Sequence, residues 1–206
     1  LRDHITTESV VEVEGGMLTL THSWFKDNDA ERSLLVIGDD IEVRGVEFAD
    51  PSNGRIVSLG GTGRAEFYNS WFFATGGGSV LVSDSPILIE NTTFVLDADS
   101  TGIVTTSDTI IRNSIFTGDP AAIGIWDDPA EVTYSNFFGI VDRCSELGCV
   151  AIEGMGILHV DPELVDFNRH LSATSPCIDA GDPDALFNDV DTTRNDMGAS
   201  GGPGAI

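Results

Sequence analysis

Basic residues are scarce in this sequence of 206 residues, which has 10 lysines and arginines against 34 acidic residues and a formal net charge of −24. Lys26 is its single lysine. A surface with this charge repels nucleic acid and anionic membranes, so neither is an expected partner. The same surface attracts divalent cations and suits a saline medium.

Long apolar runs are missing as well. No run approaches the roughly 18 apolar residues that a membrane-spanning helix needs, so we expect no membrane insertion. Neither an initiating methionine nor a signal peptide stands at Leu1, and we expect the chain to be a processed or excised piece of a longer protein. The apolar content of 41% is nevertheless enough for a continuous core.

Cysteine is rare too, and its three positions are too few for a disulfide scaffold. Cys144 and Cys149 flank the short loop Ser-Glu-Leu-Gly, and we predict that they form a disulfide in an oxidising compartment. A zinc site is not expected, because no Cys-x-x-Cys occurs and no histidine lies near this loop. Cys177 is expected to be a free, buried residue.

Sequence motifs of common enzymes are also absent. The chain contains no Gly-x-Ser-x-Gly, no His-Glu-x-x-His and no phosphate-binding loop. Its four histidines are scattered along the sequence, which favours structural or surface roles over catalysis. We therefore predict no catalytic residue from the sequence alone.

What the sequence does have is a short phrase repeated six times: an apolar residue, three mostly polar residues, a variable residue and then phenylalanine. The phenylalanines are separated by 23, 24, 22, 22 and 21 positions: Phe25, Phe48, Phe72, Phe94, Phe116 and Phe137. A period in this range marks a solenoid, in which each unit buries its apolar face against its neighbours. One phenylalanine at the same place in every unit predicts a ladder of packed rings in the core.

A second apolar run precedes each phrase, with glycine, aspartate and proline between the two. Alternation within the phrases favours strands over helices, since Leu18 and Leu20 share one face and Thr19 and Thr21 the other. Two strands, two bends and a loop in about 22 residues form one coil of a parallel β-helix. We predict an all-β, single-stranded parallel β-helix with about six to seven rungs and an irregular carboxyl-terminal cap.

The spacing inside the phrase predicts a bend. Val43 and Phe48 are five positions apart, so one straight strand could not point both side chains inward. Asparagine tolerates the backbone conformation of such a bend, and it occurs there in three units, at Asn69, Asn91 and Asn113. We expect these three to stack one rung apart, about 4.8 Å, and their amides to hydrogen-bond from one rung to the next.

At the carboxyl end, three segments resemble those of a known family: 161–166, 168–183 and 191–204. The family is the right-handed parallel β-helix repeat proteins of bacterial surfaces and secretions, with the pectate-lyase-like fold. The resemblance is strong in 161–204 and extends to the repeat pattern before it. It implies a right-handed β-helix and an extracellular or cell-surface location.

These observations predict one domain in three parts. Residues 1–9 are a lead-in or partial rung, and residues 10–138 hold the repeated rungs. Residues 139–206 form the last rung, the cap and a tail rich in glycine and proline. From Gly198 onward we expect this tail to be an extended linker.

Two groups of side chains are candidates for binding. Trp24 and Trp71 occupy the same position before phenylalanine, two units apart, and could stack on sugar rings if that position faces outward. The pattern favours the other role, in which they cover a corner of the core. The acidic carboxyl-terminal group is a candidate calcium site: Asp179, Asp182, Asp189, Asp191 and Asp196. No cofactor is required by the sequence. A hydrogen-bonded cap is the alternative explanation for these aspartates, since the glycine and final glutamate of an EF-hand are missing.

The function that we expect is that of a structural or adhesive module of a larger extracellular protein. Its partners would be the missing amino-terminal rungs or its own chain stacked end to end, and a polysaccharide is a further candidate. The alternative is a polysaccharide lyase, a glycoside hydrolase or a carbohydrate-binding module on the same fold. A lyase is disfavoured because Arg44 and Arg112 lie three rungs apart without a concentrated acidic and basic cluster, and because the charge repels polyuronates.

Overall fold

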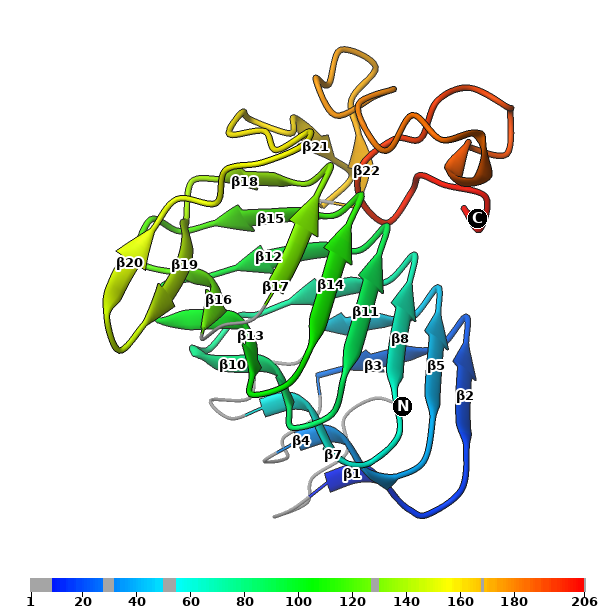
Figure 1. Cartoon of the computed structure of the whole chain (residues 1–206), viewed down its shortest axis with the longest axis vertical. Helices are drawn as coiled ribbons and strands as arrows, with labels where there is room; N and C mark the ends of the chain where they lie inside the picture. Colours follow the sequence, from blue (N-terminus) through cyan, green and yellow to red (C-terminus); the bar gives the residue numbers. More distant parts are fainter. Residues whose placement is uncertain (1–8, 28–31, 50–54, 127–129, 168, 206) are drawn as a thin grey trace.

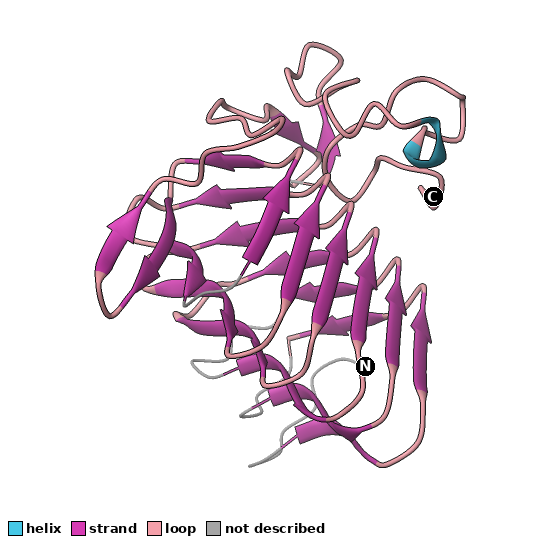
Figure 2. Cartoon of the chain, in the orientation of Figure 1, coloured by secondary structure: helices cyan, strands magenta, loops and turns pink. Residues whose placement is uncertain are grey.

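The chain folds into a parallel β-solenoid with three faces (Figures 1 and 2), and the computed structural model describes residues 9–27, 32–49, 55–126, 130–167 and 169–205. The described part contains strands, loops and one short 3-10 helix, so the predicted all-β solenoid is confirmed. Of the predicted lead-in 1–9, only Ser9 lies within the described residues, at the start of the first strand.

Six successive rungs each contribute one strand to each of three sheets, and β19 and β20 extend the first sheet. The first sheet has eight strands, in the order β1 (Ser9–Glu14), β4 (Arg32–Gly38), β7 (Arg55–Gly61), β10 (Gly78–Ser83), β13 (Ser100–Thr105), β16 (Ile123–Trp126), β19 (Val141–Ser145) and β20 (Gly148–Val150). The second has six: β2 (Leu18–Thr21), β5 (Ile41–Arg44), β8 (Ala65–Tyr68), β11 (Ile87–Glu90), β14 (Thr109–Arg112) and β17 (Ala130–Thr133).

The third sheet also has six strands: β3 (Trp24–Lys26), β6 (Glu47–Ala49), β9 (Trp71–Phe73), β12 (Thr93–Leu96), β15 (Ile115–Gly118) and β18 (Asn136–Phe138). Apart from the β19–β20 hairpin, every pairing in these sheets is parallel. A separate antiparallel pair, β21 (Leu164–Val165) and β22 (His170–Leu171), and the helix η1 (Ala185–Phe187) belong to the carboxyl-terminal segment.

The predicted phenylalanine ladder fills the interior. All six rings are at most 3% exposed. Successive ring centroids lie 4.9, 4.9, 4.8, 4.5 and 4.9 Å apart, and the rings are stacked at interplanar angles of 19° or less. The rung spacing of a parallel sheet is close to the separation that stacked aromatic rings prefer, so backbone pairing and ring packing reinforce each other.

The predicted bend is present at the three asparagines. Asn69, Asn91 and Asn113 have φ values of 48°, 47° and 53°, in the left-handed region that asparagine tolerates better than most residues. The hydrogen bonds that link one bend to the next are made by serine side chains and not by the asparagine amides. The hydroxyl of Ser114 accepts a bond from the Thr92 backbone N–H of the preceding rung, at 3.2 Å, and donates to the Arg112 carbonyl at 2.9 Å.

The expected amide-to-amide ladder is therefore wrong. The asparagine side chains point outward and bind the carboxyl-terminal segment. Asn69 Nδ2 donates to the carbonyls of Ala199 and Gly201, at 3.1 and 2.6 Å, and Asn91 Nδ2 donates to the carbonyl of Asp196 at 2.9 Å. Asn113 Oδ1 accepts from the backbone N–H of Asp182 at 2.7 Å.

The carboxyl-terminal segment consequently lies along the side of the solenoid. Figure 1 shows it, in orange to red, beside the ends of β11 and β14. The prediction of an extended linker from Gly198 onward is wrong, because Ala199, Gly201 and Gly202 are buried against the rungs. At Gly202 the φ is +79°, and a Cβ would lie only 2.5 Å from Asn91 Oδ1, so a side chain has no room there.

Residues 139–160 cover the carboxyl end of the coil. Strand β20 turns back onto β19, and the structure joins Cys144 to Cys149 as predicted, with an S–S distance of 2.00 Å. In place of a last strand, Leu158 forms a single parallel bridge with Asn136. Cys177 is free and fully buried, and burial raises the pKa of its thiol to about 12.

The ladder predicts a large effect of truncation in its middle. Phe94→Ala should lower the free energy of unfolding by about 3–5 kcal/mol, because it removes buried ring surface and leaves a cavity between two other rings. Phe138→Ala, next to the ladder but 36% exposed, is the matched control and should cost less than about 1 kcal/mol. Urea denaturation measures both, and similar losses for the two variants would contradict the packed ladder.

The buried tail predicts a strong effect of one methyl group. Gly202→Ala should destabilise the protein by about 2–3 kcal/mol, because it combines an unfavourable φ with the clash at Asn91. Gly16→Ala is the control, since Gly16 has nearly the same φ, +80°, but open space around the Cβ position. Thermal and urea melts of the two variants separate the clash from the backbone strain, and equal losses would show that the tail is not packed against the asparagines.

Candidate functional site

A groove with a volume of about 370 Å³ lies on the third sheet at the amino-terminal rungs. Its floor is an outward column in which Trp24 pairs with Glu47 and Glu47 pairs with Trp71, on β3, β6 and β9. Other lining residues come from the bend, which supplies His22 and Gly45, and from the carboxyl-terminal segment, which supplies Arg169 and His170. The groove thus brings together both tryptophans that the sequence indicated.

The two tryptophans are held differently. The side chain of Trp24 is 69% exposed, so most of the indole is accessible at the open end of the groove. Trp71 is half-buried, and its Nε1 donates to the carbonyl of Arg169 at 3.0 Å. The alternative in which both residues cover a corner of the core therefore does not apply to Trp24.

Between the tryptophans, Glu47 is fixed by Arg169. Arg169 Nε donates to Glu47 Oε2 at 3.0 Å, and Nη2 contacts Oε1, so the pair is bidentate. Glu47 is only 9% exposed, and its hydrogen bonds raise the pKa of Arg169 further. The guanidinium also lies over Phe73, 5.2 Å from the ring centroid. The floor is accordingly a rigid, charge-compensated polar patch between two aromatic side chains.

Arg169 and His170 were not expected from the sequence to be site residues. They stand 122 and 123 positions after Glu47, within a segment that was expected to close the end of the coil. The amino-acid sequence gives no periodic signal for their position, because they lie outside the repeats. Their place is set by the path of the carboxyl-terminal segment along the side of the solenoid.

On the later rungs the same outward column is covered. Thr93 and Ile115 continue the column from Trp71, and both are almost fully buried. Ile115 packs in a cluster with Cys177 and Met197, and the Thr93 hydroxyl accepts the backbone N–H of Ala199 at 3.0 Å. The groove is thus the part of the column that the carboxyl-terminal segment leaves open.

Four of the candidate calcium ligands accept hydrogen bonds from backbone N–H groups. Asp182 and Asp191 bond to the backbone two residues further on, at Asp184 and Thr193. Asp196 accepts the backbone N–H of Asp179 at 2.7 Å, and Asp189 accepts those of Asp196 and Gly202. In the described part of the chain, no three His, Cys, Asp or Glu side chains form a group that could hold a metal ion. The hydrogen bonds of these aspartates favour a hydrogen-bonded cap over a calcium site.

Three of these aspartates, Asp179, Asp189 and Asp196, lie close enough to perturb one another. Burial is the main cause that raises the pKa of Asp196, to about 6, and the neighbouring carboxylates of Asp189 and Asp179 add to it. Burial also raises the pKa of Asp189. By contrast, hydrogen bonds from Thr193 lower the pKa of the exposed Asp191.

The outward face of the second sheet carries charged side chains that are paired with one another. Arg44 bonds to Glu42 and stacks on Tyr68, at 3.9 Å from the ring centroid. Arg112 binds Glu90 at 2.6 Å. Tyr68 lies between these two groups, and burial and its bond to Glu66 raise its pKa to about 12. Contrary to the expectation from the sequence, acidic and basic side chains do lie together on this face. Each arginine, however, already has an acidic partner.

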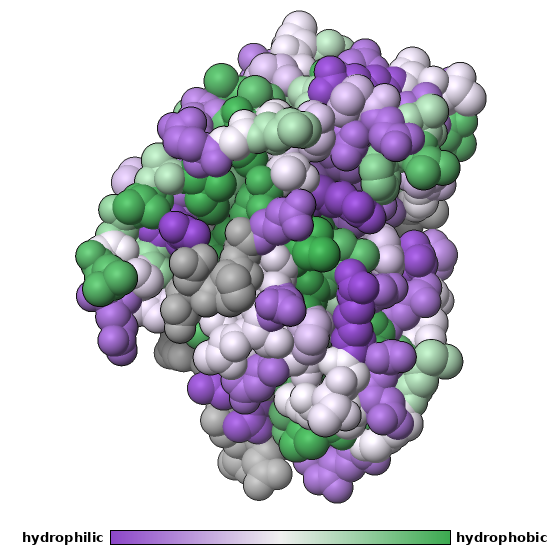
Figure 3. All heavy atoms as spheres, viewed as in Figure 1, coloured by the Kyte–Doolittle hydropathy of each residue, from purple (hydrophilic) through white to green (hydrophobic). Residues whose placement is uncertain are grey.

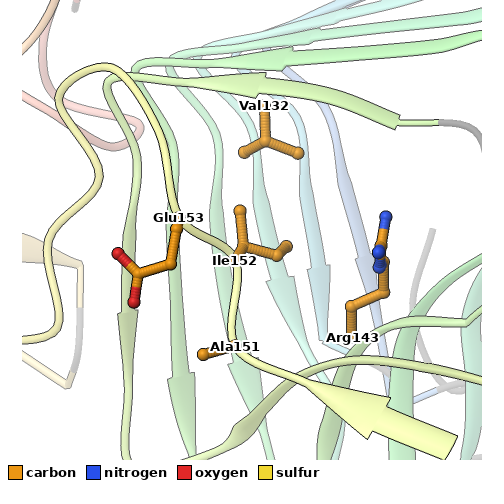
Figure 4. A pocket seen from close by; sticks show the side chains of 5 residues that line it. All are labelled: Val132, Arg143, Ala151, Ile152 and Glu153. Atoms are coloured by element: carbon orange, nitrogen blue, oxygen red, sulfur yellow. The ribbon is translucent and has the colours of Figure 1, made fainter.

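A second cavity, of about 360 Å³, lies near the carboxyl end of the coil. Figure 4 shows Arg143 and Glu153 at different sides of it, with Val132, Ala151 and Ile152 between them. None of the predicted site residues lines it. In the space-filling view of Figure 3, polar and apolar side chains are mixed over the visible face.

No family model, no curated protein and no solved structure matched the chain. Within the described residues, no helix is long and apolar enough to cross a membrane. The geometry of the groove and the sequence resemblance at the carboxyl end are therefore the grounds for a functional proposal.

The raised pKa of Asp196 predicts that one substitution stabilises the protein. The folded protein binds the proton of Asp196 more tightly than the unfolded chain does. The protonated side chain therefore contributes stability below the unfolded-state pKa near 3.8, and this contribution is lost as the pH rises through about 6. Asp196→Asn keeps the oxygen that accepts the Asp179 N–H. It should raise the free energy of unfolding at pH 7 by about 1–2 kcal/mol, allowing for solvent screening, and much less near pH 4.

Asp191→Asn is the control, because the pKa of Asp191 is shifted the other way. Its contribution is present at neutral pH and is lost as the pH falls, so this variant should be less stable at pH 7. Urea denaturation at both pH values gives the comparison. A destabilising effect of Asp196→Asn at pH 7 would show that its ionised form is needed, for example by a bound cation.

Proposed function

We propose that the chain is a structural and adhesive module of an extracellular protein, and that it adheres by binding glycans in the groove between Trp24 and Trp71. The carboxyl-terminal sequence supports the extracellular setting through its resemblance to β-helix proteins of bacterial surfaces with the pectate-lyase-like fold. That resemblance supports a family and a location, whereas the site has to support the activity.

One observation carries the proposal: two tryptophans of one outward column line the same groove, with a fixed ion pair between them. Flat apolar rings next to hydrogen-bonding groups suit a sugar, which has apolar C–H faces and hydroxyl edges. The column lies on a parallel sheet, so the site is formed before the ligand arrives and little ordering is needed on binding.

The lining of the groove favours binding over hydrolysis. Glycoside hydrolysis generally needs two carboxyl groups on either side of the bond that is cleaved. Glu47 is the single carboxylate among the seven described lining residues, and Arg169 holds it. On the second sheet, Arg44 and Arg112 are paired with Glu42 and Glu90, which leaves neither as a ready base for a lyase.

Affinity gel electrophoresis against a panel of cell-wall and exopolysaccharides tests the proposal. At least one polysaccharide should retard the protein, and Trp24→Ala should weaken its binding by about tenfold or more, as expected for an aromatic anchor. Trp126→Ala is the control, since Trp126 is also exposed but lies on β16 of the first sheet. Full mobility with every polysaccharide, or unchanged binding by Trp24→Ala, would contradict the proposal.

We also propose that the amino-terminal rung is a contact surface. Its inward residues Val11, Val13, Leu18 and Leu20 are only partly buried, whereas their partners in the next rung are at most 5% exposed: Leu34, Val36, Ile41 and Val43. Strands β1, β2 and β3 are the edges of their sheets. Such edges recruit other strands, either from preceding rungs of a longer chain or from a second copy.

Among the described residues, the amino-terminal end of the solenoid offers this surface and the carboxyl-terminal end does not. At the other end, β20 and residues 150–160 already pair with the last rung: Tyr134 N–H bonds to Met155 and Phe137 N–H to Leu158, at 2.8 and 2.9 Å. A head-to-tail stack would need both ends open. In place of the end-to-end stack expected from the sequence, we propose that two amino-terminal ends meet in a symmetric dimer.

Light scattering at moderate salt checks this second proposal. The isolated chain should reach the mass of a dimer at high concentration and stay there, and Leu18→Lys should keep it monomeric because the charge would be buried at the contact. Glu12→Lys, on an outward position of the same rung, is the control. Growth beyond a dimer would contradict the claim that the carboxyl end is closed to pairing. A monomer at all concentrations would contradict the claim that the first rung is a contact surface.

A further inference from the structure

The spacing of the two tryptophans is set by the backbone and suggests the shape of the ligand. Trp24 and Trp71 are two rungs apart in register, with Glu47 between them. Strands in a sheet are about 4.8 Å apart, so the two positions are separated by about 10 Å along the solenoid axis. In a straight β-1,4-linked glycan, alternate rings are flipped, and equivalent ring faces recur every second sugar over a similar length.

The faces of the sugar matter as well as their spacing. Stacking on an indole requires a ring face that presents C–H groups and no axial hydroxyl, as in a pyranose with equatorial substituents. Curved α-1,4-linked chains turn successive rings away from one line. They cannot place equivalent faces on two tryptophans fixed along a straight column.

Polar groups in the middle of the groove fit a neutral sugar. Arg169 uses two of its five N–H donors on Glu47, so it retains donors for a hydroxyl, and the Glu47 oxygens can accept from one. Because this pair is already charge-compensated, it offers no free cation to a carboxylate or sulfate. The net charge of −24 opposes any polyanionic glycan.

The carboxyl-terminal segment covers the column on the later rungs, and this sets the direction in which a bound glycan can leave the groove. Thr93 and Ile115 continue the column beneath Ala199 and Met197, which closes the groove beyond Trp71. Trp24, 69% exposed on the first rung, stands at its open end. A bound chain therefore lies along the solenoid axis, covers about three sugars and leaves the groove past Trp24.

We propose that the groove selects a straight, neutral, β-1,4-linked glycan, with one ring on Trp24, the next over the Glu47–Arg169 pair and the third on Trp71. This inference rests on the proposed glycan-binding function and specifies its ligand class. It differs from the polyuronates that the fold resemblance would suggest, and the difference comes from the charge and the lining of this groove.

Calorimetric titration of the whole chain with three hexasaccharides tests the ligand class: cellohexaose, maltohexaose and hexagalacturonate. Cellohexaose should bind at least tenfold more tightly than maltohexaose, and hexagalacturonate should give no heat at low salt. Trp24→Ala should weaken cellohexaose binding by tenfold or more, and Trp71→Phe should weaken it severalfold. The control Trp126→Ala should leave it unchanged. Trp24 is exposed enough that its removal spares the fold, which a thermal melt verifies.

The outcomes separate this inference from the function on which it rests. Binding of maltohexaose or hexagalacturonate as tight as that of cellohexaose, and lost in Trp24→Ala, would overturn the ligand class and leave a glycan-binding groove. Cellohexaose binding that Trp24→Ala does not weaken would overturn the placement on the tryptophans. If none of the three binds and the polysaccharide panel is also negative, both the ligand class and the proposed function fail.

Discussion

Backbone pairing between consecutive rungs is the constraint on which the rest of the structure depends. A parallel pairing in register repeats every side-chain position at the rung spacing, so one phenylalanine per rung becomes a stack with centroids 4.5–4.9 Å apart. No rung can bury its apolar face alone, and stability is therefore shared between neighbours. The same repetition applies outside, where Trp24, Glu47 and Trp71 form a column because Phe25, Phe48 and Phe72 form a ladder. A surface of fixed spacing is a direct consequence of the core.

The carboxyl-terminal segment adds a second constraint that the repeats do not contain. It lies on the asparagine column through backbone contacts, and it approaches so closely at Gly202 that no side chain fits. On the later rungs it buries the outward column, and near the first rungs it supplies Arg169 as a wall. The groove exists because the segment covers only part of the column. Structure and proposed function are thus linked through one irregular stretch.

Much of the fold could be predicted because repetition makes local chemistry visible. The period identified the rungs, the odd spacing from Val43 to Phe48 required a bend, and asparagine at the bend matched its positive φ. The partners of those asparagines could not be predicted, since their contacts with Ala199 and Gly201 join residues about 130 positions apart in a segment without periodicity. For the same reason the tryptophans were recognised as candidates, whereas Arg169 was not. The aspartates show the limit of composition, because their bonds to backbone N–H groups depend on the local turns.

Amide hydrogen exchange of the carboxyl-terminal segment tests most directly whether it is docked along the solenoid and so forms the groove. The N–H groups of Gly198 and Ala199 lie outside any strand, yet they bond to the Asn113 carbonyl at 2.7 Å and to the Thr93 hydroxyl at 3.0 Å. If the segment is docked, these amides should exchange as slowly as those of β12 and β15, far below the rate of an unstructured peptide. Exchange at the unstructured rate, with the strands still protected, would show that the segment is not docked and does not form the groove.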